Sequence, residues 1–341
     1  MLKLHTSTIN LKLTEPFRIS RSVQYEAKRV VVSIESAGQI GIGEAASSSF
    51  YGETHDTVSA CLATYVDHLG DDPFALEDIL TTLEKTLHRN AAARAAIDMA
   101  LYDLVGKLLG VPVYKLLGLN PTQTPRTSFT IGLDTPAEMA RKASQAKDFP
   151  ILKVKLGSRQ DIDCVKAIRD VSNATIRVDA NAGWTVKEAI KLIEDLTPYQ
   201  IEFVEQPLPP ADLDGLRFIR EHSAMPIFAD ESCVTVEDIP RVAGCVDGIN
   251  IKLAKCGGVR QALKMIHTAR AHHLQIMLGC MIESSLGITA AAQISPLVDY
   301  ADLDGHLLID NDPYRGVRVE EGKLILPQEP GLGVTAKEPE R

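Results

Sequence analysis

Three lysines lie inside short runs of otherwise apolar residues in the second half of the chain. Lys153 and Lys155 belong to ILKVKLG (151–157), and Lys252 belongs to GINIKLA (248–254). Such runs are typical of strands that are covered by helices. Because side chains alternate between the two faces of a strand, Lys153 and Lys155 point the same way, and the aliphatic residues beside them point the other way. We therefore expect these ammonium groups to share an internal face.

Three carboxylates follow neighbouring runs of the same kind, namely Asp179, Glu205 and Asp230. Like charges held close together raise one another's pKa unless a cation neutralises them. An all-oxygen donor set without histidine or thiolate suits Mg²⁺, whereas zinc prefers nitrogen or sulfur ligands. The alternative is that the acids only form ion pairs with the three lysines. A buried ionic cluster without a function, however, usually reduces stability.

The lysines predict proton transfer. Lys155 comes from the second expected strand and Lys252 from the sixth, so the two amines would lie on opposite sides of the metal site. Two such bases can remove a proton from one face of a carbon and return one to the other face. Burial and the neighbouring ammonium of Lys153 would lower the pKa of Lys155 toward neutrality, as a base requires. A proton α to a carboxylate is barely acidic, so the resulting enediolate needs a metal at its oxygens.

Eight strand-like runs position these residues, and their first residues lie 22 to 27 positions apart. Segments with helical periodicity, such as 186–196 and 260–272, lie between them. This alternation predicts an α/β fold in which parallel strands close into a TIM-type barrel, with the active site at their C-terminal ends. An open doubly wound sheet is the alternative, but no glycine-rich phosphate turn follows an early strand. The runs are TSFTIGL (127–133), ILKVKLG (151–157), TIRVDAN (175–181), IEFVEQP (201–207), PIFADES (226–232), GINIKLA (248–254), QIMLGCM (275–281) and DYADLDG (299–305).

The first third of the chain has a different pattern. LHTSTINLKL, VVVSIESAG and GIGEA indicate an antiparallel meander, and residues 90–110 predict a long helix that ends at Gly110. We expect an α+β capping domain over residues 1–122 and a barrel over 123–315. A final segment, 316–341, is expected to return to the cap.

Composition excludes several classes of function. The net charge of −9 and the pI near 5.5 argue against nucleic acid or an anionic membrane as a partner. No apolar run approaches the ~20 residues that span a bilayer, and the N-terminal residues show no secretion signal. Six scattered cysteines without a C-x-x-C pair are typical of reduced thiols. We therefore expect a cytoplasmic enzyme, and the sequence leaves open whether it forms a homo-oligomer.

Several motifs follow one another in a fixed order. They are GIGEA (41–45) and YGET (51–54), then KVK (153–155), VDAN (178–181), VEQP (204–207), ADES (229–232), INIKLAKCGG (249–258) and GCMIESSLGITAA (279–291). In this order and spacing they resemble the enolase superfamily, in its muconate-lactonizing-enzyme-like subgroup, over nearly the whole chain. The resemblance implies a modified TIM barrel of the (β/α)7β type behind an N-terminal α+β capping domain. It also implies that Asp179, Glu205 and Asp230 bind Mg²⁺.

The same resemblance implies roles for the lysines. Lys155 and Lys252 would be the two acid/base residues, and Lys153 would assist Lys155 and the substrate carboxylate. Lys255 competes for the role of the strand-6 base. It lies three residues later, in the loop and on the opposite face, so Lys252 is preferred. No histidine base follows strands 6 or 7, which argues against the mandelate-racemase-like subgroup.

The stretch ADLDG (301–305) distinguishes reactions within the subgroup. Asp302 and Asp304 share a face at the end of the eighth strand and would hold a cation. In the dipeptide epimerases of the resembled subgroup, a D-x-D here binds the free α-ammonium of the first residue. The structural alternative is an acid pair that caps a loop. His306 beside the pair has no family role, and we expect it to face solvent.

The resemblance therefore implies an Mg²⁺-dependent dipeptide epimerase that inverts the α-carbon of the C-terminal residue, with L-Ala-D/L-Glu of cell-wall recycling as the first candidate substrate. Family members acting on L-Ala-L/D-Glu use an arginine near EPFRISRS (15–22) for the glutamate carboxylate. Arg21 aligns better than Arg18, and a solvated loop arginine is the alternative. N-acylamino-acid racemase and o-succinylbenzoate synthase share the two lysines and remain alternatives. A non-catalytic, metal-dependent ligand-binding protein is the alternative of another class.

Overall fold

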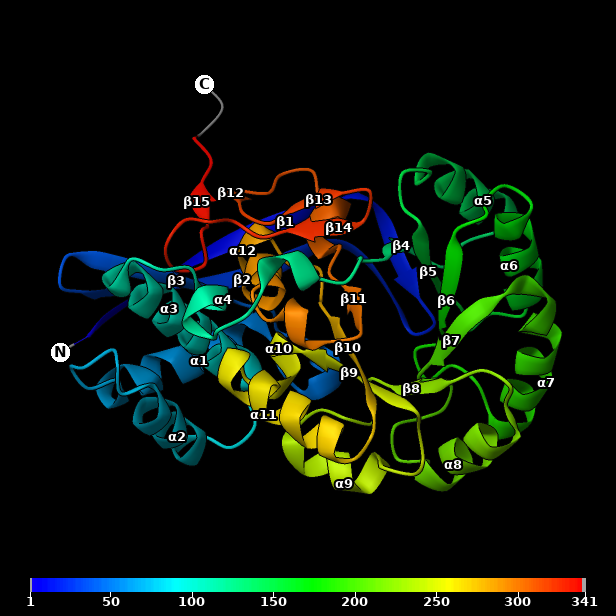
Figure 1. Ribbon diagram of the computed structural model, residues 1–341, viewed down its shortest axis with the longest axis horizontal. Coiled ribbons are helices and arrows are strands. Elements are labelled where there is room, and N and C mark those ends of the chain that lie inside the picture. The colour runs from blue at the N-terminus through cyan, green and yellow to red at the C-terminus, as the bar shows by residue number, and fades with distance from the viewer. Residues whose placement is uncertain (1, 339–341) are drawn as a thin grey trace.

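Eight parallel strands form the centre of the computed structural model, which describes residues 2–338 (Figure 1). Neighbouring strands follow one another in chain order, and a parallel bridge between Thr127 and Ala301 links the first strand's N-terminal end to the last strand. The TIM-type barrel predicted from the sequence is thus confirmed, although its first and last strands are shorter than the apolar runs. The strands are β4 (Phe129–Ile131), β5 (Ile151–Lys155), β6 (Thr175–Asp179), β7 (Ile201–Glu205), β8 (Ile227–Ala229), β9 (Gly248–Lys252), β10 (Gln275–Gly279) and β11 (Tyr300–Asp302).

Helices cover the outside of the barrel and fill the connections between its strands. The described chain has no α-helix after β11, where only the 3-10 helix η7 (Gly305–Leu308) follows, so the barrel has the expected (β/α)7β form. The predicted segment 186–196 coincides with α7. The helices are α5 (Pro136–Gln145), α6 (Asp161–Arg169), α7 (Val186–Leu196), α8 (Leu213–His222), α9 (Ile239–Val242), α10 (Leu253–Cys256), α11 (Val259–Ala271) and α12 (Ser285–Ala292).

The interior of the barrel is closed at its N-terminal end by aromatic side chains. Phe203 and Phe228 stack with ring centroids 4.2 Å apart, and Tyr300 packs edge-on against both. Each of these residues lies two positions before a carboxylate on the same strand face, because the side-chain period of a strand is two. The aromatic layer therefore fills the barrel from below, and the ionisable layer lies above it at the C-terminal ends.

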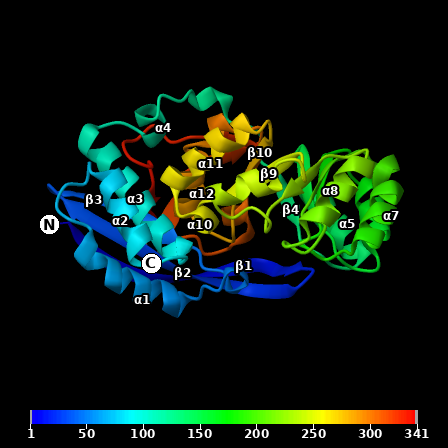
Figure 2. The ribbon, with the colours of Figure 1, turned by 90° about the horizontal axis from the view of Figure 1, so that it is seen from below.

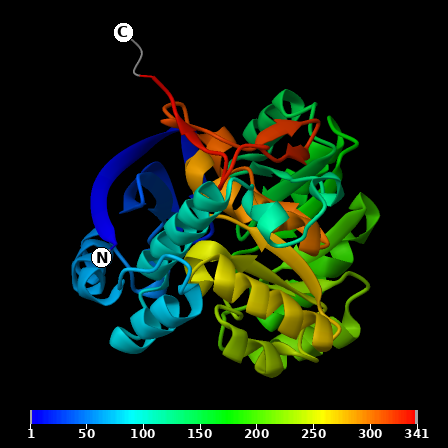
Figure 3. The same ribbon diagram turned by 60° about the vertical axis from the view of Figure 1, so that its left-hand side comes forward.

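The N-terminal part of the chain forms a three-stranded antiparallel sheet with helices on one side. Figure 3 shows the long helix α3 (cyan) between this sheet and the barrel, and α3 contacts both β3 and α10. The elements are β1 (Lys3–Ile19), β2 (Ser22–Ser36), β3 (Gln39–Ala45), α1 (His55–Tyr65), α2 (Leu76–Thr86), α3 (Ala91–Leu109) and α4 (Val113–Leu116).

Two glycines of the motif GIGEA allow α3 to lie directly on the sheet. A Cβ added at Gly43 would meet the carbonyl oxygen of Ala96 at 2.0 Å, and one added at Gly41 would meet that of Ala100 at the same distance. The facing side of α3 is correspondingly rich in alanine. Small residues on both surfaces thus determine how closely the cap sheet and α3 approach one another.

The β1–β2 hairpin extends from the cap sheet toward the barrel (Figure 2). Its two-residue turn consists of Ser20 and Arg21, because Ile19 pairs with Ser22. The pairing of β1 with β2 is interrupted between Lys12 and Phe17. The stretch EPFRISRS is therefore mostly strand and turn rather than an open loop.

The C-terminal segment forms small strands and contacts the cap. Leu332 N donates a hydrogen bond to the buried Asp103 of α3, and Val113 N of α4 donates to Gly331 O. The small strands are β12 (Tyr314–Arg315), β13 (Arg318–Glu320), β14 (Lys323–Ile325) and β15 (Thr335–Ala336). All six cysteines are free thiols, as the sequence predicts. Among residues 2–338, no helix combines the length and the apolar character that crossing a membrane requires.

We predict that Gly43→Ala lowers the free energy of unfolding by about 1–3 kcal/mol, because the added methyl group forces α3 away from β3. Chemical denaturation of the two proteins measures this difference. Gly132→Ala is the matched control, since its Cβ would meet no atom closer than 3.4 Å, and we expect a change below about 0.5 kcal/mol. Equal stability of both variants would contradict the close packing of α3 on the sheet.

Candidate active site

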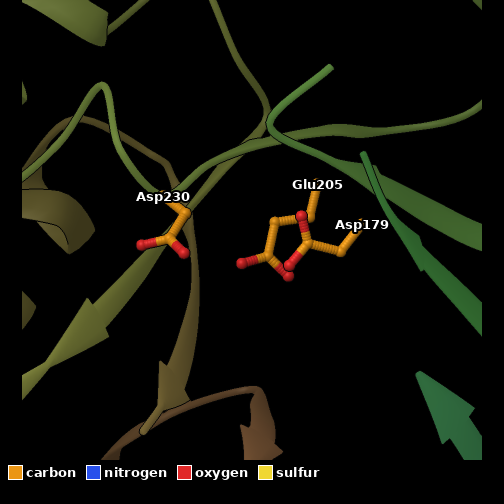
Figure 4. Close-up of side chains that lie close together, drawn as sticks. All are labelled: Asp179, Glu205 and Asp230. Atoms are coloured by element: carbon orange, nitrogen blue, oxygen red, sulfur yellow. The ribbon is translucent and has the colours of Figure 1, made fainter. Parts of the chain in front are cut away.

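Three carboxylates meet at the C-terminal ends of adjacent strands. Asp179 and Glu205 end β6 and β7, where they are register partners, and Asp230 follows β8 directly. One oxygen of each residue lies within 4.8 Å of the others, and all three side chains are buried (Figure 4). The acidic cluster predicted from the sequence is therefore a single site.

The acidic cluster has the properties of a cation site. Glu205 Oε1 accepts a hydrogen bond from Asn250 Nδ2 at 2.7 Å, whereas Oε2 has no hydrogen-bond partner. Burial and the neighbouring Asp179 raise the pKa of Glu205 to about 7. A buried carboxylate oxygen without a partner is costly unless a cation neutralises it. Since all donors are carboxylate oxygens, the residues fit a hard divalent ion such as Mg²⁺.

Two lysines flank the cluster at its opposite ends. Lys155 Nζ at the end of β5 donates to Asp179 Oδ2 at 2.6 Å, and Lys252 Nζ at the end of β9 donates to Asp230 Oδ2 at 2.8 Å. Three strands, β6 to β8, separate the strands that carry them. Both lysines line the same cavity. The structure thus brings the two predicted bases to opposite sides of one space.

Lys153 lies deeper than Lys155 and connects two groups of acids. Its ammonium is 1% exposed and lies 2.7 Å from both Glu205 Oε2 and Asp302 Oδ2, and 3.2 Å from Asp179 Oδ2. Lys153 therefore links the acidic cluster to the acid pair of the eighth strand.

The expected lowering of lysine pKa values is wrong for Lys153 and Lys252. Burial favours the neutral amine of Lys153, but Asp302, Glu205 and Asp179 outweigh it and hold its pKa well above the ordinary value. Burial also opposes the charge of Lys252, and Asp230 outweighs that effect in the same direction. The sequence argument counted the neighbouring ammonium and underestimated the field of the carboxylates, which a bound divalent cation would offset.

Lys255, the competing candidate for the strand-6 base, does not line the cavity. Its ammonium is fully buried and donates to both the carboxylate and the backbone carbonyl of Asp230, and to the carbonyl oxygens of Cys233 and Asn250. A lysine with this many acceptors is held as a support for Asp230. The geometry favours Lys252 over Lys255 as the residue that faces a substrate.

Asp302 and Asp304 are buried and line the cavity. Asp302 already accepts hydrogen bonds from Ser128 Oγ and Lys153 Nζ, both at 2.7 Å. Asp304 Oδ2 accepts from the backbone N–H of Thr130 at 2.6 Å, and burial together with Asp302 raises its pKa to about 7. Of the two acids, Asp304 is the one whose negative charge is least compensated.

Arg21 reaches the site from the tip of the β1–β2 hairpin. Its Nη2 lies 2.7 Å from Glu231 Oε1, its Nη1 donates to Asn181 O at 2.8 Å, and its guanidinium lies 4.2 Å from the centre of the Phe50 ring. Arg21 lines the cavity, whereas Arg18 does not. The guanidinium is therefore partly engaged, rather than free as the solvated alternative assumed.

A cavity of about 520 Å³ unites these groups. The barrel contributes the lysines and the acid pair, the hairpin contributes Phe17 to Gln24, and the loop after β10 contributes Cys280 to Ile282. A cavity of this size accommodates a small organic molecule. Two cap–barrel contacts fix its wall: Arg29 Nε donates to Ile282 O at 2.8 Å, and Ser284 donates to the buried Glu44.

Sequence reasoning missed Asn250 and Glu231. Asn250 lies two residues before Lys252, so strand alternation places both on the inner face, and this signal was available. Glu231 follows Asp230 in ADES, but only the folded hairpin shows that it pairs with Arg21.

His306 is buried, so the expectation of a solvent-facing histidine is wrong. The residue lies in η7, and its Nδ1 has no hydrogen-bond partner. Burial lowers the pKa of His306 to about 4. The polar surroundings in the sequence gave no sign that the chain turns inward after Asp304.

Family models match both parts of the chain. The model described as enolase C-terminal domain-like matches residues 136–340, and the N-terminal domain model of mandelate racemase / muconate lactonizing enzyme matches residues 2–118. The chain belongs to this family. The resemblance inferred from the motifs is thereby confirmed.

Relatives of this family member have related names. The L-Ala-D/L-Glu epimerase of Bacteroides thetaiotaomicron is 44% identical over 98% of this chain and 88% of its own length. The structure of a dipeptide epimerase from Enterococcus faecalis with Mg and L-Leu-L-Tyr superimposes with a TM-score of 0.93 at 37% identity, covering 97% of this chain and 98% of that one. A substrate-liganded L-Ala-D/L-Glu epimerase from Bacillus subtilis gives 0.92 at 34% identity, covering 98% of each chain.

We predict that His306 makes the protein less stable in acid. Because its pKa falls from about 6.5 in the unfolded chain to about 4 in the folded one, the unfolded state binds more protons between these values. The stabilisation present above pH 6.5 is therefore lost as the pH falls toward 4. In His306→Gln, the difference between the free energies of unfolding at pH 6.5 and pH 4.5 should shrink by about 2–3 kcal/mol.

The matched control for this prediction is His267→Gln, which changes an exposed histidine of α11. Urea denaturation at the two pH values measures the difference for each protein. An unchanged pH dependence in His306→Gln would contradict burial of the neutral ring.

Proposed function

We propose that the protein is an Mg²⁺-dependent dipeptide epimerase that inverts the α-carbon of the C-terminal residue. The observation that carries the proposal is the placement of Lys155 and Lys252 at opposite ends of one buried acidic cluster, facing a common cavity. Two amines on opposite sides of one carbon are what inversion by proton transfer requires. The names of the relatives support the same reaction.

Asp179, Glu205 and Asp230 would hold the Mg²⁺ ion. When bound, the ion supplies positive charge that offsets the negative charge developing on the substrate carboxylate as its α-proton leaves. Asn250 orients Glu205, and Lys255 orients Asp230. Such supporting contacts hold metal ligands in their binding geometry.

The two lysines exchange roles between the two directions of the reaction. In one direction Lys155 accepts the α-proton and Lys252 donates a proton to the opposite face, and the reverse direction uses them the other way round. Lys153 holds Asp179 and Glu205 from below and adds positive charge near the substrate carboxylate.

Asp304, with Asp302, would bind the α-ammonium of the first residue. A buried acid whose charge is poorly compensated favours a cationic partner, which N-acylated amino acids and succinylbenzoate precursors lack. This argument favours free dipeptides over the substrates of the alternative racemase and synthase. The intact pair of lysines argues against a non-catalytic ligand-binding protein.

The second residue would place its side chain near Arg21. An acidic side chain could share this guanidinium with Glu231, which makes L-Ala-D/L-Glu the first substrate to test. Such a dipeptide arises in cell-wall peptidoglycan recycling, and we place the enzyme in the cytoplasm.

We predict that the enzyme with Mg²⁺ exchanges the α-proton of the second residue of L-Ala-L-Glu for deuterium in deuterium oxide while both epimers form. Lys252→Ala should lose epimerisation by at least about 1,000-fold, because one of two essential acid/base groups is absent. It should retain exchange of a single epimer through Lys155. NMR follows the loss of the α-proton signal, and chiral chromatography follows the epimers.

Lys187→Ala, which changes an exposed lysine of α7, is the matched control and should leave both rates unchanged. Epimerisation without deuterium incorporation would refute proton transfer at the α-carbon. A Lys252→Ala variant with full epimerase activity would refute the assignment of the second base.

We predict that Asp304→Asn lowers kcat/KM for free dipeptides by about 30-fold or more, since it removes the buried charge opposite the ammonium. N-acetylated dipeptides, which carry no ammonium, should lose far less. Steady-state kinetics on both substrate types gives the comparison, and Asp310→Asn changes an exposed acid nearby as the control. Equal losses on both types would indicate that Asp304 only supports Thr130.

A further inference from the structure

A second cavity of about 350 Å³ adjoins the active site on its eighth-strand side. It lies where β1 interrupts its pairing with β2, so that Leu13 to Pro16 turn away from the sheet. The opposite wall comes from β4, α5 and the residues that follow α5. The cavity is thus enclosed by the hairpin on one side and by the barrel on the other.

The walls of this cavity are mainly apolar. Phe129 and Phe149 pack with ring centroids 4.8 Å apart, and Ala146 and Leu13 lie among the other lining residues. The charges at the rim compensate one another, because Lys142 Nζ lies 3.2 Å from Asp134 and 3.5 Å from Glu15. The cavity therefore suits an apolar group and offers no uncompensated charge to an ionic one.

The two cavities share the residues that separate them. Phe17, Thr130 and Leu308 line both the main cavity and the second one. The backbone N–H of Thr130 donates to Asp304, the acid that the proposed function assigns to the substrate ammonium. The second cavity thus begins next to the position where the first residue of a dipeptide would be held.

From this arrangement we infer that the second cavity is the subsite for the side chain of the dipeptide's first residue, and that it accepts large apolar and aromatic side chains. The inference rests on the proposed function, because the ammonium and that side chain are attached to the same α-carbon. With the ammonium at Asp304, a side chain that passes between Phe17 and Leu308 enters the apolar space. The enzyme therefore acts on dipeptides with a bulky apolar first residue as well as on those that begin with alanine.

The test compares L-Ala-L-Glu with L-Phe-L-Glu in the deuterium-exchange assay. The wild-type protein should turn over L-Phe-L-Glu with a kcat/KM within about 10-fold of that for L-Ala-L-Glu, since one pocket contact seldom discriminates more strongly. Ala146→Leu adds volume inside the cavity and should lower kcat/KM for L-Phe-L-Glu by about 10-fold. The same variant should change L-Ala-L-Glu by less than about 2-fold, because alanine does not reach the cavity.

Ala137→Leu is the matched control, since Ala137 is an exposed residue of the same helix that does not line the cavity. It should leave the ratio of the two substrates unchanged. Phe17→Leu shortens the shared wall and should shift the ratio toward L-Phe-L-Glu, which keeps the inference testable if Ala146→Leu lowers both activities together.

Failure of the inference and failure of the proposed function give different results. Exchange with L-Ala-L-Glu, but with a ratio that neither Ala146→Leu nor Phe17→Leu changes, overturns the subsite alone. Turnover of L-Ala-L-Glu with no turnover of L-Phe-L-Glu overturns it as well. The absence of exchange with both dipeptides overturns the proposed function, and the inference with it.

Discussion

Mutual repulsion among three buried carboxylates is the constraint on which the site depends. Burial of Asp179, Glu205 and Asp230 removes the water that would screen their charges, so their Coulomb energy opposes folding. The lysine ammonium groups and the Asn250 amide offset part of this cost, and the paired strands prevent the acids from moving apart. Replacing such a cluster by apolar residues often raises stability. Its presence in the core of the barrel is therefore best explained by cation binding.

The fold separates the parts that resist this repulsion from the parts that surround the substrate. Strand alternation stacks the ionisable layer on the aromatic layer of Phe203, Phe228 and Tyr300, so the carboxylates cannot retreat into the barrel. The cap is anchored separately, through the close approach of β3 to α3 and through the contacts of Arg29 and Glu44 with the loop after β10. The lysines thus belong to the rigid barrel, whereas much of the cavity wall belongs to the cap.

Strand alternation explains why so much of this arrangement could be predicted. Once eight apolar runs with a regular period were recognised, the faces of Lys155, Asp179 and Lys252 followed from parity alone, and so did the barrel. Contacts between segments far apart in the sequence did not follow. The pairing of Arg21 with Glu231 depends on where the hairpin turn lies, and the burial of His306 depends on how the chain packs after β11. The raised lysine pKa values depend on distances to several carboxylates at once, which no single strand encodes.

The β1–β2 hairpin has a particular place in substrate choice because it borders both cavities. Its turn carries Arg21, and its irregular stretch before Phe17 forms the wall of the apolar cavity. Since Arg21 is already paired with Glu231, an acidic side chain must share that guanidinium, and the attraction is weaker than a free arginine would provide. The hairpin contributes neither the two lysines nor the three carboxylates. Substitutions in it can therefore change which side chains are accepted at either end of a dipeptide while the proton-transfer geometry stays fixed.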